Sequence, residues 1–353
     1  MIADIRLQSQ QLINPVFDSP KELVAYMGAI QAQEYTMARW AVGVRLKSGS
    51  LTAVNEALQK GEILRTHVMR PTWHFIAAED IRWMLKLSGK RIIAANDSYA
   101  KGHCQDISAE TYHKAFRLLE KLLEGNNHQT KLELEEAFRK DGFETDDRQI
   151  NRFFTRAEAE GLICSGADKG SKPTFALLEE RVPPVKELHK EEALAKLAHN
   201  YFRSHSPATL ADFIWWSGLT TTEAKLAMNL ISDELTNDLY ADRQLFVHNS
   251  CKEPEHSDIL HLLPSFDEYL ISYKDRTDVL DLQHHPKAFN TFGTFHPVVL
   301  YQGKIVGNWK KTPLKNELKI ETSWFEKSPK IKKTLLSEGE KRLKTFYSSP
   351  IKK

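Results

Sequence analysis

One pattern occurs three times along the chain: helical segments are followed by two short strands joined by a turn. The first copy ends over residues 63–77, where apolar and polar residues alternate on both sides of Arg70-Pro71, which is typical of a hairpin. Helices followed by such a hairpin indicate a winged helix, that is, a helix-turn-helix with a β wing. Because the copies recur at about 60 to 75 residues, we expect tandem modules rather than one large fold.

The helix that opens the first copy leads into a pair of glutamines. Ser19-Pro20-Lys21-Glu22 predicts its start, with a serine cap, proline in the first turn and glutamate three residues after the cap. Gln31 and Gln33 then follow the last apolar residues of the helix. Residues two apart do not share a helical face, so the helix must end or distort here if both amides serve one site. Taken alone, the pair more often marks a solvated helix end.

The second copy, over residues 108–182, contains a helix of the recognition type. Arg148, Arg152 and Arg156 lie one turn apart on it. This cationic stripe fits contact with a duplex backbone. A salt-bridged face towards solvent is the alternative, because Glu158 and Glu160 lie nearby.

The third copy follows Pro183-Pro184, and the sequence pattern changes after it. We interpret its tryptophan pair, Trp215-Trp216, as core packing between helices. From residue 256, strand-like stretches and a Gln302-Gly303 turn predict a small β-barrel, closed by a lysine-rich helix over residues 331–346. The predicted fold is therefore mainly α with β (α+β). It has winged helices over residues 1–105, 106–184 and 185–255, and a β-barrel with a basic C-terminal helix over residues 256–353.

Composition narrows the functional classes. Apolar residues make up 41% and charged residues 27% of the 353 residues, which is typical of a soluble globular protein. Neither a membrane-spanning run nor a signal peptide is visible, so we expect a cytoplasmic protein. Cys104, Cys164 and Cys251 are isolated, which suits a reducing compartment and argues against disulfides or a cysteine-based zinc site. We expect no metal and no cofactor.

Charge is distributed unevenly along the chain. The net charge is only +2, but residues 301–353 contain fourteen Lys or Arg against five Asp or Glu. A cationic C-terminal stretch fits phosphate contacts. The alternative is a solvated, lysine-rich terminal helix.

Five blocks in a fixed order carry a specific resemblance. They are Gln31-Ala32-Gln33; Arg65-Thr66-His67 with Thr72-Trp73-His74; Pro207-Ala208-Thr209 through Trp215-Trp216-Ser217-Gly218; Leu263-Pro264-Ser265-Phe266-Asp267-Glu268-Tyr269; and Pro297-Val298-Val299-Leu300 through Gly307-Asn308-Trp309. On these blocks nearly the whole chain resembles the AlkZ/YcaQ family of winged-helix DNA glycosylases. That family excises alkylated purines and unhooks interstrand crosslinks, and its members carry Gln-x-Gln or Gln-x-Asp at the catalytic position. The chain is of the Gln-x-Gln type, so the resemblance makes Gln31 and Gln33 the catalytic residues.

The chemistry agrees with these two side chains. A purine alkylated at N7 or N3 is cationic and leaves the sugar as a neutral molecule, so it needs little acid catalysis. What remains is to stabilise an oxocarbenium-like sugar and to aim a water at C1′. A carboxamide cannot act as a general base, but it can orient a water and donate from its NH2 group. Since nothing marks a lysine for Schiff-base chemistry, we expect a monofunctional enzyme that leaves an abasic site.

The expected partner is double-stranded DNA with alkylated purines or crosslinks. A crosslinked purine cannot flip fully out of the duplex, so the modules should form an open, concave DNA-binding surface. The residues expected to contact DNA are Arg65, His67, Arg70, His296, Lys310 and Lys311. A structural role is the alternative for His67, and an exposed loop position for His296. Asp267 and Glu268 resemble a glycosidase carboxylate pair, but adjacency should point them apart.

We expect a nucleoid-associated monomer without a membrane partner. The competing interpretation is a non-enzymatic winged-helix transcriptional regulator, which would need base-reading side chains and usually a dimerisation element. Arg148, Asn151 and Arg152 could supply the first, whereas no heptad or other dimerisation pattern supplies the second. A scaffold that binds a protein partner is a third possibility.

Overall fold

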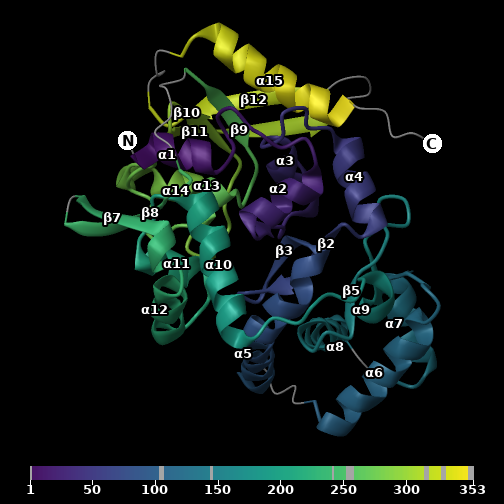
Figure 1. Cartoon of the computed structure of the whole chain (residues 1–353). Coiled ribbons are helices and arrows are strands. Elements are labelled where there is room, and N and C mark those ends of the chain that lie inside the picture. The colour runs from purple at the N-terminus through teal and green to yellow at the C-terminus, as the bar shows by residue number, and fades with distance from the viewer. Residues whose placement is uncertain are drawn as a thin grey trace. The chain divides into compact units, whose positions relative to one another are not determined.

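The chain divides into two compact units that are interleaved in sequence. Unit 1 comprises Met1–Asn55 and Leu194–Lys353, and unit 2 comprises Glu56–Ala193. The computed structural model describes residues 2–102, 107–143, 146–240, 242–251, 258–313, 318–326 and 331–348 (Figure 1). The four-module boundaries expected from the sequence do not coincide with this division, because the unit boundary after Asn55 falls within the predicted module 1–105. They stay a prediction.

The N-terminal part of unit 1 is helical around one short extended segment. Its elements are α1 (Ile2–Ser9), α2 (Pro20–Met27), β1 (Ile30–Gln31) and α3 (Tyr35–Gly43), and α4 (Leu51–Lys60) runs from unit 1 into unit 2. The Ser19 side chain caps α2 by accepting a hydrogen bond from the Glu22 N–H at 3.4 Å, as predicted. The helix ends at Gly28, whose φ of 78° suits glycine. The predicted break before the glutamines is therefore confirmed.

The middle part of unit 1 combines helices with one hairpin. Its elements are α10 (Lys190–His205, which begins in unit 2), α11 (Leu210–Ser217), α12 (Thr221–Asn229), η2 (Ser232–Glu234), β7 (Leu235–Tyr240) and β8 (Arg243–His248). Capping boxes start α11 at Thr209 and α12 at Thr220. Trp216 is fully buried, which confirms core packing for this residue, whereas Trp215 is 39% exposed. The strand β7 was not predicted from the sequence.

The C-terminal part of unit 1 is an open sheet with one long helix. Its elements are β9 (Leu260–Leu263), α13 (Glu268–Ile271), η3 (Leu282–His284), α14 (His285–Ala288), β10 (Val298–Tyr301), β11 (Lys304–Pro313), β12 (Leu318–Trp324) and α15 (Lys333–Ser348). The antiparallel order is β12-β11-β10-β9, and α15 packs against the edge strand β9 (Figure 1). A barrel requires paired edges. Among the described residues β9 and β12 do not pair, so the predicted closed barrel is not found.

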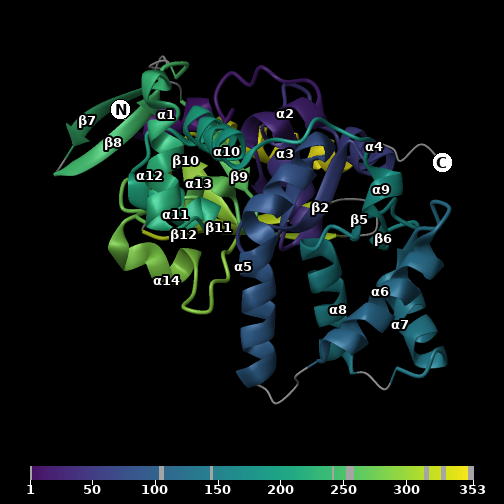
Figure 2. The same cartoon turned by 60° about the horizontal axis from the view of Figure 1, so that its bottom comes forward.

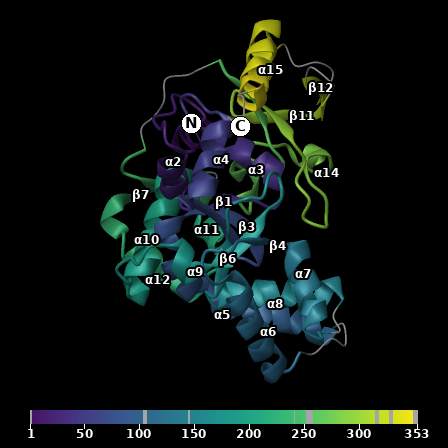
Figure 3. The ribbon, with the colours of Figure 1, turned by 90° about the vertical axis from the view of Figure 1, so that its right-hand side faces the viewer.

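Unit 2 contains two hairpins and a helical cluster. Its elements are β2 (Ile63–Val68), β3 (Thr72–Ala77), η1 (Ala78–Asp80), α5 (Ile81–Gly102), α6 (Ala109–Leu123), β4 (Gln129–Thr130), α7 (Lys131–Lys140), α8 (Asp147–Ala159), β5 (Ile163–Ser165), β6 (Thr174–Leu177) and α9 (Leu178–Arg181). The helix α5 packs beside α8 (Figure 2). The helices α6, α7 and α8 lie close together (Figure 3). Their core of aromatic and aliphatic side chains includes Phe138 and Phe153.

Within the described ranges, no helix is both long and apolar enough to cross a membrane.

Candidate active site

The two glutamines lie on the extended segment between α2 and α3. Gln31 is 3% exposed, whereas Gln33 is exposed. The next residue, Glu34, caps α3 by accepting hydrogen bonds from the N–H groups of Thr36 at 3.3 Å and Met37 at 2.6 Å. One amide is thus set into the interior of unit 1, and the other faces solvent.

The carboxylate of Glu268 holds the main chain at Gln31. Its Oε1 accepts a hydrogen bond from the Gln31 N–H at 2.5 Å, across 237 positions of sequence. Its Oε2 accepts from Trp216 Nε1–H at 3.2 Å and from the hydroxyl of Ser272, and His205 Nε2 lies 3.5 Å away. Glu268 is 1% exposed. Both carboxylate oxygens are therefore engaged in fixing this part of unit 1.

The donors around Glu268 keep it ionised. Burial by itself raises the pKa of this carboxyl, but the contacts with His205, Ser272 and the Gln31 N–H outweigh burial and lower the pKa to about 2. Burial also lowers the pKa of His205, which opposes a positive charge on the imidazole. We assign an anionic Glu268 at neutral pH, because the Gln31 N–H, Trp216 and Ser272 donate to the carboxylate in addition to its contact with His205.

The neighbouring carboxylate, Asp267, serves a different partner. Arg45 Nη2 and Nη1 donate to its two oxygens at 2.7 and 2.9 Å, and Oδ1 also accepts from the Tyr269 N–H at 2.9 Å. Both ionic side chains are almost completely buried. The expectation that Asp267 and Glu268 point apart is confirmed, and the two do not form a glycosidase-type carboxylate pair.

The predicted DNA contacts of the first hairpin lie on or next to β2. His67 is 9% exposed, its Nδ1 lies 2.5 Å from Glu158 Oε2, and its ring lies 3.9 Å from that of Trp73. The guanidinium of Arg65 lies 4.3 Å from the centre of the Trp73 ring, and Arg70 is half-buried in the turn. The geometry fits the structural alternative for His67, and DNA contact by Arg65, His67 and Arg70 stays a prediction.

The predicted C-terminal contacts lie on β11 and before β10. The Lys310 side chain is 72% exposed, with Nζ 3.2 Å from Glu321 Oε2. The Nζ of Lys311 lies 3.7 Å from the centre of the Tyr347 ring, and burial lowers the pKa of Lys311 to about 8. His296 is an exposed loop residue two positions before β10, as expected. Lys310 therefore offers the more accessible charge, and DNA contact by all three stays a prediction.

The arginine stripe of the second copy is largely occupied within unit 2. Arg152 is 3% exposed, and Arg156 Nε donates to Glu160 at 2.8 Å. The salt-bridged alternative is thus confirmed at Arg156, and of the three arginines only Arg148 is exposed. This arrangement buries Arg152, one of the three side chains expected to read bases, whereas Arg148 and Asn151 are exposed.

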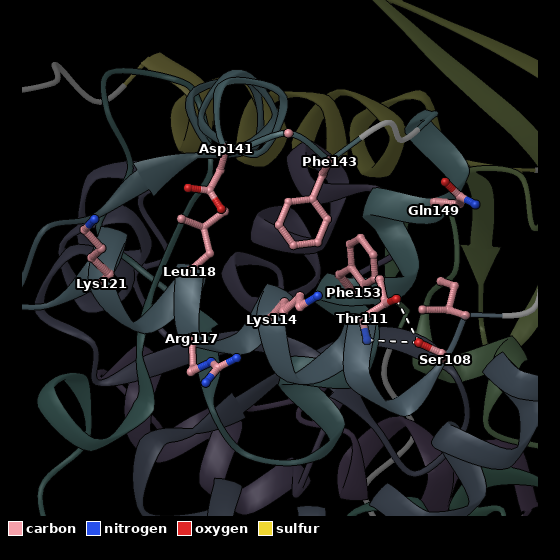
Figure 4. A pocket seen from close by; sticks show the side chains of 12 residues that line it. Ser108, Thr111, Lys114, Arg117, Leu118, Lys121, Asp141, Phe143, Gln149 and Phe153 are labelled. Atoms are coloured by element: carbon pink, nitrogen blue, oxygen red, sulfur yellow. Dashed lines mark hydrogen bonds between the residues drawn. The ribbon is translucent and has the colours of Figure 1, made fainter.

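Sequence reasoning missed a cationic hollow in unit 2. The hollow has a volume of about 680 Å³ and lies against α6 and α8 (Figure 4). Lys114, Arg117 and Lys121 line it from α6, and Phe143 and Phe153 from the apolar side. The helical spacing of the three cations could have revealed this face. Position alone could not have revealed Glu268 as the partner of Gln31, because the two are far apart in sequence.

Three comparisons place the chain among known proteins. The family model of DNA glycosylase AlkZ-like proteins matches residues 24–345. An interstrand DNA cross-link repair glycosylase of Streptomyces sahachiroi is 25% identical over 331 residues, which cover 86% of this chain and 85% of that protein. The solved structure of the Streptomyces sahachiroi DNA glycosylase AlkZ has a TM-score of 0.76 at 20% identity, with coverage of 98% of this chain and 95% of that one.

These matches cover both the glutamine segment and the carboxylate that holds it. The mixed α/β architecture is that of the AlkZ structure. Since the family model spans most of the sequence, the chain belongs to the AlkZ-like DNA glycosylase family.

Proposed function

We propose that this glycosylase hydrolyses the N-glycosidic bond of purines made cationic by alkylation at N7 or N3, and that it unhooks interstrand crosslinks of this kind. It acts without full base flipping and leaves an abasic site. The observation that carries the proposal is the fixed, extended Gln31 segment, anchored through its main chain by Glu268.

The two amides share the work of hydrolysis. Gln31 is the last residue of β1, and Gln33 lies in the short connection before α3 begins at Tyr35, so neither amide is part of a helix. Gln31, which is buried, orients the water from a fixed position. Gln33, which is exposed, supports the sugar as positive charge develops on it. A cationic purine needs no strong acid to leave, so amides suffice for this substrate.

Glu268 acts as a positioning residue rather than as the general base. Its two oxygens already accept hydrogen bonds from Gln31, Trp216 and Ser272, and the side chain is almost completely buried. A base needs an oxygen within reach of the attacking water. We therefore assign the orientation of the attacking water to the two glutamines. Glu268 positions the segment that carries them.

The three helix–hairpin segments act as winged helices that bind the duplex. Phosphate contacts supply most of the affinity, through side chains that include Arg65, Arg70, Lys310 and Lys311. His67 and His296 complete the proposed set. We further propose a monomer that acts on the nucleoid in the cytoplasm.

The test uses a duplex with one N7-methylguanine, incubated with the enzyme and then treated with alkali to cleave abasic sites. We expect strand scission with the wild type and a much slower reaction with the Gln31→Ala/Gln33→Ala double variant purified in parallel. Tight, sequence-selective binding without strand scission would instead support the alternative function, a non-enzymatic winged-helix transcriptional regulator.

Two further assays resolve the finer points. A duplex with one N7-linked interstrand crosslink should yield separated strands on a denaturing gel. Borohydride added during the reaction should trap no covalent protein–DNA adduct. A trapped adduct would contradict the monofunctional assignment.

A further inference from the structure

Two histidines and a glutamate converge at the base of the β7–β8 hairpin. His199 comes from α10, Glu234 is the last residue of η2, and His248 is the last residue of β8. One donor atom from each lies within 4.8 Å of the others. The isolated cysteines gave no indication of a metal site, but these residues are distant in sequence and only the fold brings them together.

The three donor atoms are arranged around one point. Glu234 Oε2 lies 2.5 Å from His199 Nδ1 and 3.0 Å from His248 Nε2. The imidazole rings are nearly perpendicular, at 83°, with centres 5.1 Å apart. In a tetrahedral zinc site with bonds of about 2.0–2.2 Å, donor atoms lie about 3.3 Å apart. Small side-chain rotations would therefore open the cluster enough for a cation.

Neighbouring groups hold the cluster in place. His248 Nδ1 accepts a hydrogen bond from the main-chain N–H of Ser250 at 3.1 Å and lies 2.7 Å from the Ser250 hydroxyl, and the two contacts fix the plane of the imidazole ring. The His248 N–H donates to Ser206 Oγ at 3.0 Å, and the Asn249 N–H donates to the Glu234 carbonyl at 2.8 Å. Metal-binding histidines usually have a hydrogen-bond partner on the ring nitrogen that does not bind the metal, and for His248 the Ser250 hydroxyl is in that position.

The alternative is a simple cluster of hydrogen-bonded ion pairs. Two neighbouring imidazoles that both carry a proton would repel each other around a single carboxylate. A divalent cation satisfies all three groups at once.

We propose that His199, Glu234 and His248 bind one Zn²⁺ ion, with water as the fourth ligand. Two imidazoles and one carboxylate are a ligand set that zinc favours. The side chains of His199 and Glu234 are 35% and 42% exposed, which leaves the fourth position open to solvent. The proposal does not depend on the glycosylase reaction.

The ion would join α10 to both strands of the hairpin. Glu234 immediately precedes β7, and the first residue of β7, Leu235, pairs with His248 in β8. The hairpin extends from this base to the exposed side chains of Leu239 and Tyr240. Zinc would thus fix the root of a hairpin whose far end is exposed.

The experiment measures zinc in the full-length protein without a histidine tag. The protein is stripped with a chelator, titrated with ZnCl₂ and desalted, and bound zinc is measured by mass spectrometry. We expect one ion per chain that is lost in His199→Ala/His248→Ala. The more conservative Glu234→Gln keeps hydrogen-bonding capacity and should weaken zinc binding by more than about 100-fold. Circular dichroism in chelator checks that each variant folds.

A second cluster supplies the matched control. Asp281, His284 and Glu326 also bring three donor atoms together, but its two carboxylates are exposed. His284→Ala should leave the zinc content unchanged. Cobalt should give the d–d absorption of a tetrahedral site in the wild type and in His284→Ala, but not in Glu234→Gln. Equal zinc content in the wild type and Glu234→Gln, or its loss in His284→Ala alone, would overturn the proposal.

Discussion

Each unit of the molecule buries a glutamate beside a histidine, and the two pairs behave differently. In unit 1, Glu268 accepts hydrogen bonds from Gln31, Trp216 and Ser272 in addition to its contact with His205, and its pKa falls to about 2. In unit 2, His67 is the partner of Glu158, and burial raises the pKa of that carboxyl. Among the described residues, Glu158 Oε1 has no hydrogen-bond partner.

The difference shows that hydrogen-bond donors around a buried carboxyl, rather than the extent of its burial, decide whether it is ionised. Both side chains are equally inaccessible to water, so desolvation opposes charge in both. Glu268 stays ionised because fixed N–H and O–H groups replace the lost water. For Glu158, the contact with His67 and the charge of Arg65 offset burial only in part. The anionic site is the one that holds the proposed catalytic segment.

Glu268→Gln should have the largest effect. The amide would turn its NH2 group towards donors that now face an oxygen, and we expect the free energy of unfolding to fall by about 3 kcal/mol at neutral pH. Excision per folded molecule should fall as well, because the Gln31 main chain loses its anchor. Chemical denaturation and single-turnover excision measure the two effects.

Asp267→Asn is the matched control for that change. It weakens a neighbouring buried contact with Arg45 but leaves the Gln31 anchor in place. We expect lower stability with near-normal excision per folded molecule. Equal losses of excision in both variants would show that Glu268 acts only through stability.

The pH dependence of stability sharpens the same comparison. The pKa of Glu268 is lowered from 4.5 to about 2, so its contribution is complete above about pH 4.5 and is lost as the pH falls towards 2. The gap in unfolding free energy between wild type and Glu268→Gln should narrow over that range. A gap that stays constant down to pH 2 would contradict the assigned ionisation.

Gln31→Ala and Gln33→Ala should each reduce excision by about 10- to 1,000-fold, the effect of one lost transition-state contact. Binding to an unreactive damaged duplex should change little, and the double variant should lose less than the sum of the single losses if the amides share one water. Gln33→Asp should retain activity and extend it to poorer leaving groups. Single-turnover kinetics test these outcomes, and full activity in both alanine variants would refute the catalytic assignment.

Glu158→Gln should have a smaller effect than Glu268→Gln. The raised pKa means that ionised Glu158 weakens the fold, and this penalty is absent below its ordinary value of 4.5. Replacement by an amide should therefore change the free energy of unfolding by no more than about 1 kcal/mol. Denaturation at neutral pH measures it, and a loss as large as that of Glu268→Gln would remove the distinction between the two pairs.

The smallest effect should come from the two neighbouring lysines of β11, Lys310 and Lys311. Neutralising Lys310 or Lys311 should reduce the salt dependence of duplex binding by about one unit per lost phosphate contact. With a pKa of about 8, Lys311 is charged at pH 7 and neutral at pH 9. For the wild type, the salt dependence of duplex binding should therefore be weaker at pH 9 than at pH 7. For Lys311→Met it should be the same at both pH values. A slope that neither substitution changes would exclude both contacts.

Local structure was predictable wherever the sequence contains capping or turn residues next to the helix or strand that they begin or end. The capping box formed by Thr130 and Glu133 starts α7. Ser50 caps the start of α4, and Gly61, with a φ of 74°, follows its last residue. The hairpins β2–β3 and β10–β11 also lie where alternation and turn residues placed them. These features depend on neighbours a few residues apart.

Long-range partnerships were not predictable in the same way. Gln31 is positioned by Glu268, and Asp267 is paired with Arg45 across 222 positions of sequence. The stripe of arginines in α8 appeared suited to DNA because its partner Asp97 belongs to a different helix, α5. Among the described residues the predicted barrel is not found closed, for a related reason: alternation identifies strands but does not say whether the outer two pair.

The main-chain anchor at Gln31 has an evolutionary consequence. Glu268 binds a peptide N–H, which every residue except proline possesses, so the anchor makes no demand on the side chain it fixes. Gln33, two positions on, is exposed and lies outside this buried network. A single codon change at position 33 can therefore exchange an amide for a carboxylate without rebuilding the protein interior. Selection on the proposed activity can therefore act at one exposed residue while the buried network around Glu268 stays unchanged.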